Sequence, residues 1–128
     1  MEAEELMIGD WVLDKAVSEK PVQVLQINLK NVHYEHEKGY ISVGTEIIEP
    51  VPLTHEILEK NGFEREGGAS RCKFDKWWLS ILHWNKGRLE LIISDDSTKL
   101  YTLDIDLKYV HQLQHALRLL GINKNIEL

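Results

Sequence analysis

The sequence predicts an α+β fold, and two features of the chain carry this prediction. The first is a series of short runs of alternating apolar and polar residues separated by turn residues, which is typical of antiparallel strands. The second is one long amphipathic stretch near the C-terminus, which needs an apolar surface to cover. We therefore expect a small, bent β-sheet or barrel over residues 1–53. Residues 54–128 are expected to form a short linking helix, an antiparallel meander and a C-terminal helix that covers it, and both parts are expected to share one compact unit.

The first half contains closely spaced sequences typical of strands, beginning after the turn signal Gly9-Asp10. Alternation over the second strand places either Val24 or Leu25 toward the core, which indicates an irregularity in the middle of that strand. The last strand contains prolines, which cannot donate to a ladder, so it is expected at a sheet edge. The expected strands begin at Trp11 and continue over Val22–Ile27, Val32–Glu35, Tyr40–Val43 and Ile47–Leu53.

A short helix is expected directly after this half. Thr54 has the side chain of an N-cap, and Leu53 and Leu58 are spaced as a hydrophobic staple. Gly62 is suited to the left-handed conformation that ends a helix, after which Phe63 can pack on Leu58.

The second half predicts an antiparallel meander with one buried face. Its strands are expected over Phe63–Arg65, Arg71–Phe74, Trp77–Trp84, Leu89–Ile93 and Leu100–Ile105. The C-terminal helix is expected over Leu107–Ile122, with Asp106 as the N-cap and Gly121 as the stop. Its apolar stripe consists of Val110, Leu113, Leu117 and Leu120.

Composition limits the function without defining it. The net charge of −6 over 128 residues argues against non-specific binding to nucleic acid, which relies on a surplus of lysine and arginine. Cys72 is the only cysteine, so no intrachain disulfide is expected. The acidic N-terminus does not resemble a signal peptide, and no apolar run reaches the ~20 residues that span a bilayer. We expect a cytoplasmic protein that does not bind membranes.

Three tryptophans form the first candidate site. Trp77 and Trp78 are expected on opposite faces of one strand, which Trp84 would end. Exposed tryptophans are typical of contacts with proteins, peptides or carbohydrates. Alternatively, Trp78 and Trp84 are covered by the N-terminal half or the linking helix.

Two histidines form the second candidate site. His111 and His115 are four residues apart on the C-terminal helix, a spacing at which two imidazoles can chelate one metal ion. Gln112 stands where the metalloprotease pattern requires glutamate, and the sequence suggests no third ligand. The helical wheel places both histidines outside the apolar stripe, so they are expected on a flank or in solvent. Asp95, Asp96, Asp104 and Asp106 are interpreted as turn and cap residues.

Two resemblances add to these expectations. The opening IGDWV, followed by the strand PVQVLQI, resembles small five-stranded barrels of the Src-homology type. Across nearly the whole chain, Ile8–Val12, Glu49–Phe63 and Tyr109–Gln114 resemble the recurring motifs of a family of short uncharacterised proteins of Bacteroides-type bacteria, often associated with prophages or mobile elements. This resemblance implies a bacterial or phage origin and supplies no catalytic residues.

The leading functional prediction is therefore a non-enzymatic interaction or accessory protein without a cofactor, whose partner is another protein or a second copy of the chain. One alternative is a metal-binding protein or hydrolase that uses His111 and His115. A further alternative is a nucleic-acid-binding module, which the acidic charge disfavours.

Overall fold

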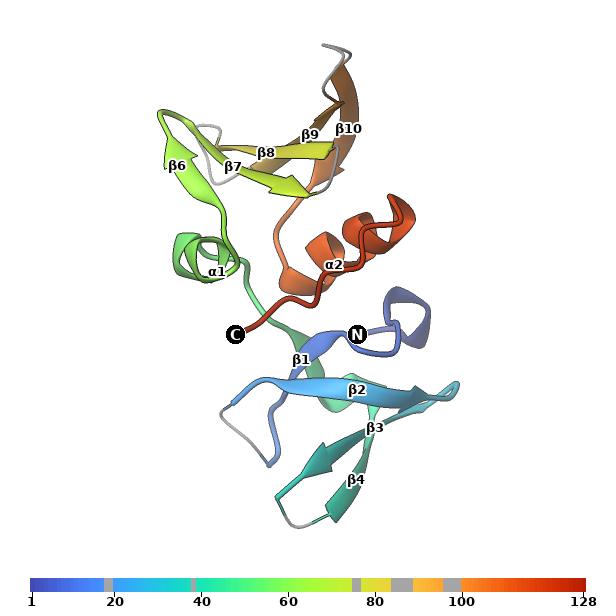
Figure 1. Cartoon of the computed structure of the whole chain (residues 1–128). Coiled ribbons are helices and arrows are strands. Elements are labelled where there is room, and N and C mark those ends of the chain that lie inside the picture. The colour runs from blue at the N-terminus through green and yellow to red at the C-terminus, as the bar shows by residue number, and fades with distance from the viewer. Residues whose placement is uncertain (18–19, 38, 75–76, 84–88, 96–99) are drawn as a thin grey trace. The chain divides into compact units, whose positions relative to one another are not determined.

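The computed structural model describes residues 1–17, 20–37, 39–74, 77–83, 89–95 and 100–128, and it confirms the α+β class (Figure 1). The described residues form two five-stranded antiparallel sheets and two α-helices, with two short 3₁₀ turns. Contacts divide the chain into two compact units. The first consists of Met1–Pro52 and Tyr109–Leu119, and the second of Leu53–Lys108 and Leu120–Leu128.

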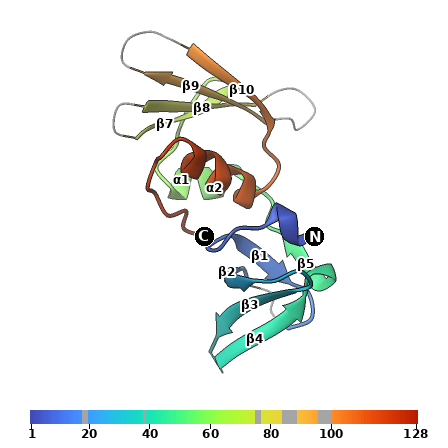
Figure 2. The ribbon, with the colours of Figure 1, turned by 90° about the vertical axis from the view of Figure 1, so that its right-hand side faces the viewer.

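The sheet of the first unit has the strand order β4-β3-β2-β1-β5 (Figure 2). The predicted barrel is wrong, because the sheet is open: within the described residues, β4 pairs with β3 alone and β5 with β1 alone. The expected edge position of the proline-containing strand is confirmed at β5. The elements are η1 (Ala3–Glu5), β1 (Trp11–Asp14), β2 (Val22–Ile27), β3 (Asn31–His36), β4 (Gly39–Gly44), η2 (Thr45–Ile47) and β5 (Ile48–Pro50).

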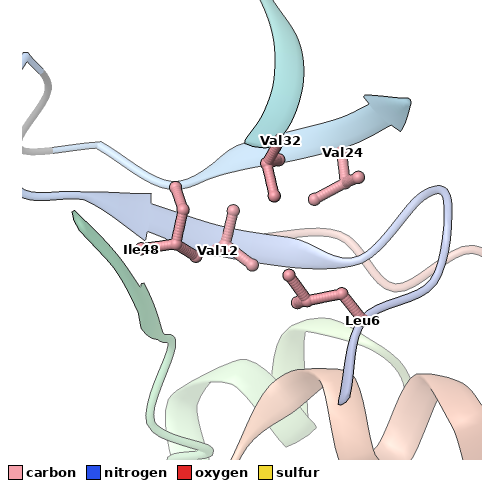
Figure 3. Close-up of a cluster of buried hydrophobic side chains, with 5 residues drawn as sticks. All are labelled: Leu6, Val12, Val24, Val32 and Ile48. Carbon is pink, nitrogen blue, oxygen red and sulfur yellow. The ribbon is translucent and has the colours of Figure 1, made fainter. Parts of the chain in front are cut away.

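Alternating side chains of this sheet form the core of the first unit. Val24 is fully buried while Leu25 is 44% exposed, and the β2–β3 register shifts between Val24 and Gln26. This shift confirms the irregularity predicted for the strand. Figure 3 shows the buried cluster, which consists of Leu6, Val12, Val24, Val32 and Ile48.

One buried carboxylate belongs to the same unit. Asp14, at the end of β1, accepts a hydrogen bond of 2.5 Å from the hydroxyl group of Tyr34 on β3. Its other oxygen accepts from the backbone N–H of Ala16 at 2.9 Å. Tyr34 and Asp14 are both fully buried, so this contact satisfies the tyrosine hydroxyl group where water cannot reach it.

The linking helix α1 (His55–Lys60) begins and ends as predicted. The Thr54 hydroxyl accepts from the N–H of Ile57 at 3.3 Å. At the other end Gly62 has φ of 89°, and the N–H groups of Gly62 and Phe63 donate to the carbonyls of Glu59 and Leu58. These two bonds form a Schellman motif, which requires a left-handed residue at position 62.

The predicted meander is confirmed in the second unit, with the strand order β10-β9-β8-β7-β6. Leu79, Ile81, Leu91 and Ile93 occupy one face of this sheet and are buried. The strands are β6 (Glu64–Glu66), β7 (Ala69–Phe74), β8 (Trp77–His83), β9 (Leu89–Asp95) and β10 (Leu100–Asp106).

The C-terminal helix α2 (Val110–Leu119) is shorter than predicted. Asp106 is not its N-cap, because β10 continues to that residue and the helix begins four residues later. The side-chain oxygen of Gln112 instead accepts from the backbone N–H of Tyr109 at 3.0 Å. Gly121 has the expected positive φ, at 72°. Although α2 was expected on the meander, its residues belong to the first unit and it contacts β1.

Candidate functional site

The two described tryptophans of the first candidate site lie on opposite faces of β8. Trp77 pairs with Phe74 of β7, and Trp78 pairs with Lys73, so consecutive residues of β8 alternate between the faces as expected. Both side chains are half-buried. Trp84 lies outside the described residues.

Trp78 belongs to a face of the second sheet that we name the outer face. The side chains that the structure describes on its strands β7, β8 and β9 are partly or fully exposed, whereas the opposite, inner face holds the four buried aliphatic residues of the meander. A tryptophan at this position combines a large apolar area with access for a ligand. The outer face includes Glu64, Glu66, Ala69, Arg71, Lys73, Trp78, Ser80, Leu82, Ile92 and Ser94.

Two cations flank the Trp78 ring. The guanidinium carbon of Arg71 lies 4.9 Å from the ring centroid and the Lys73 ammonium nitrogen lies 5.6 Å from it, both within cation–π range. Arg71 also forms an exposed ion pair with Glu66 at 3.4 Å. Arg71 and Lys73 thus place two positive charges beside an aromatic ring in a chain whose net charge is −6, and Glu64 and Glu66 of β6 lie on the same face.

Trp77 takes part in a separate feature on the inner side of the sheet. Together with Phe74 and the segment 121–123, it lines a pocket of about 280 Å³. The sequence predicted one site that contains the tryptophans. In the structure, Trp77 and Trp78 belong to two different sites on opposite faces of the sheet.

The two histidines of the second candidate site lie on α2 near the turn before β1. His115 Nε2 lies 2.7 Å from Asp10 Oδ2, which also accepts from the N–H of Met7 at 2.8 Å. Arg118 donates to the carbonyl of Ile8 at 2.5 Å, and its second nitrogen lies 3.9 Å from Asp10 Oδ1. Asp10 is fully buried, so a carboxylate is held inside the first unit by two basic side chains of one helix.

The side chain of Gln114 adds two hydrogen bonds between α2 and the segment that leads into β1. Its Oε1 accepts from the N–H of Trp11 at 3.0 Å, and its Nε2 donates to the carbonyl of Gly9 at 3.0 Å. Gly9 has φ of 92°, and a Cβ there would lie 2.7 Å from Arg118. The positive φ therefore favours glycine at this position, whereas the end of the flexible Arg118 side chain could move aside.

The position on a flank or in solvent predicted for the two histidines is wrong for His111, which is buried, while His115 is partly exposed. His111 is 5% exposed, and the side chain of His115 is 26% exposed while it contacts a fully buried carboxylate. Their rings are 5.5 Å apart and nearly perpendicular, and His111 also stacks on Tyr109 at 5.8 Å. Burial lowers the pKa of His111, an effect that the Asp10 charge opposes and His115 reinforces. Its buried Nδ1 has no hydrogen-bond partner among the described residues.

This arrangement limits the chemistry that the cluster can perform. The pair of Asp10 and His115 has the geometry of a carboxylate that orients a base. Among the described residues, no group of three histidine, cysteine or acidic side chains is positioned to hold a metal ion. His115 already directs Nε2 at Asp10, so metal binding by His111 and His115 remains a prediction that needs a further ligand.

Sequence reasoning missed a second histidine contact, in the second unit. His83 Nε2 lies 2.9 Å from the hydroxyl oxygen of Ser70, and the His83 ring lies 4.3 Å from that of His55. Burial lowers the pKa of His83, and the nearby His55 and Arg65 lower it further. Ser70 is buried, so this pair satisfies a polar group of the inner face. The alternation of residues along β8 predicted His83 on that face. That Ser70 lies near it depends on the β7–β8 register, which the sequence does not define.

No protein-family model matches the chain, and neither a curated protein nor a solved structure is significantly similar to it. None of the helices in the described parts of the chain is long and apolar enough to cross a membrane.

Proposed function

We propose that this chain is a non-enzymatic protein-binding protein, and that the outer face of its second sheet docks an acidic segment of a partner protein. The observation that carries the proposal is the placement of Arg71 and Lys73 against the half-buried ring of Trp78. Tryptophan and arginine are the side chains most enriched among residues that dominate binding energy at protein interfaces.

The chemistry of the outer face defines the partner. The Trp78 ring offers apolar contact area, and Leu82 and Ile92 extend that area on the same face. Arg71 and Lys73 favour carboxylates on the segment that covers the ring. The matching partner segment alternates acidic and apolar side chains.

Charge favours a protein segment over a nucleic acid. A nucleic-acid strand brings one negative charge per nucleotide, and the protein's net charge of −6 repels such an extended polyanion. A short acidic segment places a few carboxylates beside the two cations and brings less charge near the rest of the surface.

A binding assay with defined probes tests the proposal. The probes are a ten-residue peptide of alternating glutamate and leucine, the same peptide with glutamine in place of glutamate, and a ten-nucleotide oligo(dT) strand. The protein variants are the double substitution Arg71→Gln/Lys73→Gln and the matched control Lys60→Gln, which removes an exposed lysine of α1 in the same unit.

The acidic peptide is expected to bind in the micromolar range, and the double variant is expected to bind it at least tenfold more weakly. Lys60→Gln should retain the affinity within about twofold, and the glutamine peptide should bind as weakly as the double variant does. Equal binding of both peptides would contradict the proposed charge recognition. Stronger binding of oligo(dT), lost in the double variant, would assign the outer face to nucleic acid instead.

A further inference from the structure

The pocket on the inner side of the second sheet is a concave site distinct from the outer face. Its walls are the aromatic side chains of Phe74 and Trp77 and the chain segment from Gly121 to Asn123. At about 280 Å³ it lies near the lower limit of small-molecule pockets. All five wall residues are half-buried or exposed, so the pocket is open to solvent.

Packing fixes the aromatic wall in place. The ring of Phe74 meets that of Phe63 edge to face, with centroids 5.9 Å apart. Phe63 is buried directly after the Schellman motif that ends α1. The end of the short helix therefore supports the ring that a ligand would contact.

The opposite wall continues into a C-terminal segment that hydrogen bonds hold. Gly121 turns the chain with a positive φ, and Asn61 then holds the segment that follows. The Asn61 side chain donates to the carbonyl of Glu127 and accepts from its N–H, both at 2.7 Å. Ile126 is buried beside this contact. The anchor at Glu127 restricts the chain that leads out of this wall, four residues after Asn123.

One cation lies beside the Phe74 ring of the aromatic wall, although Lys124 does not itself line the pocket. The ammonium nitrogen of Lys124 lies 5.3 Å from the centroid of the Phe74 ring. No carboxylate of the described residues forms an ion pair with Lys124, so its charge is available to a ligand. An aromatic wall with an adjacent ammonium group matches a flat ring that bears an anionic substituent.

We propose that this pocket binds a small planar aromatic carboxylate, with its ring against Phe74 and Trp77 and its carboxylate directed to Lys124. The pocket volume limits the ligand to one or two fused rings. This site does not depend on the outer face, because its residues differ from those around Trp78.

A titration with 2-naphthoate, followed by two-dimensional ¹H–¹⁵N NMR of the full chain, tests the proposal. The indole N–H of Trp77 and the backbone amide of Gly121 report on the two walls. The neutral 2-naphthamide is the matched ligand and Lys124→Gln is the matched variant. Lys60→Gln controls for loss of an exposed lysine, and Arg71→Gln/Lys73→Gln separates this site from the outer face.

Naphthoate is expected to shift both reporters with a Kd on the order of 0.1–1 mM, as its small size implies. Naphthamide, or naphthoate with Lys124→Gln, should bind about five- to tenfold more weakly, and the other two variants should leave the Kd within twofold. Equal binding of acid and amide would overturn the role of Lys124. The absence of saturable shifts at Trp77 and Gly121 up to about 5 mM would overturn the site.

Discussion

The Nε2 atom of His115 lies 2.7 Å from Oδ2 of Asp10, although the two residues are 105 positions apart in the chain. Asp10 is fully buried and also accepts from the N–H of Met7. Replacing Asp10 by alanine leaves these donors without their acceptor, and we expect a loss of about 2–4 kcal/mol in the free energy of unfolding. Urea denaturation measures this loss.

An exposed carboxylate of the same unit provides the control. Glu49 forms an ion pair with Lys15 at 2.6 Å, and both side chains are about half exposed. Glu49→Ala should therefore lower the free energy of unfolding by less than about 1 kcal/mol. Similar losses of unfolding free energy in the two variants would show that the buried contact of Asp10 stabilises the protein no more than an exposed ion pair does.

The burial of His111 predicts a pH dependence of stability. Because its pKa is lowered in the folded protein, the unfolded chain takes up the proton first as the pH falls below about 6.5. The contribution of neutral His111 to the free energy of unfolding is therefore fully present above that pH. It is lost as the pH falls toward the pKa of His111 in the folded protein.

The variant His111→Phe isolates this contribution. It retains a ring against Tyr109 and removes the buried nitrogen that has no partner among the described residues. We expect stability at pH 7 to be equal or higher, and a smaller decrease between pH 7 and pH 5.5 than in the unmodified protein. An unchanged decrease would assign the pH dependence to other groups.

The local parts of the fold could be predicted because neighbouring residues determine them. The Thr54 cap and the Gly62 stop depend on side chains and backbone preferences within one helix. Alternation likewise placed Trp77 and Trp78 on opposite faces. Such features need no knowledge of the tertiary structure.

The polar attachment of α2 could not be predicted, because its partners are distant in the sequence. The helical wheel placed His111 outside the apolar stripe, and a polar residue there is expected in solvent. In the structure, His111 and Gln114 are buried, and Gln114 finds acceptor and donor groups at the turn before β1. The cations beside Trp78 depend in the same way on the β7–β8 register, which the sequence pattern does not define.

The buried pair of Tyr34 and Asp14 predicts an unusual tyrosine titration. Burial, followed by the hydrogen bond and the charge of Asp14, raises the pKa of Tyr34 to about 12. Protonated Tyr34 stabilises the folded protein fully below about pH 10, where tyrosine in the unfolded chain is still protonated. This contribution to the free energy of unfolding is lost as the pH rises through 12. Absorbance at ~295 nm should show one of the four tyrosines titrating late, and Tyr34→Phe should remove that step. A normal titration of all four would contradict the buried pair.

The contact between Asn61 and Glu127 predicts that one side chain holds the C-terminal segment. Asn61 is 4% exposed and makes three hydrogen bonds, two to Glu127 and one to the carbonyl of Ile57. Asn61→Ala should lower the free energy of unfolding by about 1–3 kcal/mol and accelerate hydrogen exchange at the Glu127 amide. Asn125→Ala, at an exposed asparagine of the same segment, should leave both quantities nearly unchanged. Equal protection of that amide in both variants would show that the segment is held by other contacts.

The charges beside Trp78 predict selective quenching of its fluorescence. Arg71 and Lys73 attract an anionic quencher and repel a cationic one, because both lie within 6 Å of the ring. The difference in emission between the unmodified protein and Trp78→Phe isolates this ring from the other three tryptophans. Iodide should quench that component more strongly than caesium does, and Arg71→Gln/Lys73→Gln should remove the preference. High salt should also weaken it, since ions screen charges at an exposed surface. Equal quenching by the two ions at low salt would mean that the cations do not determine the potential at the outer face, and the proposed acidic partner would then lose its physical basis.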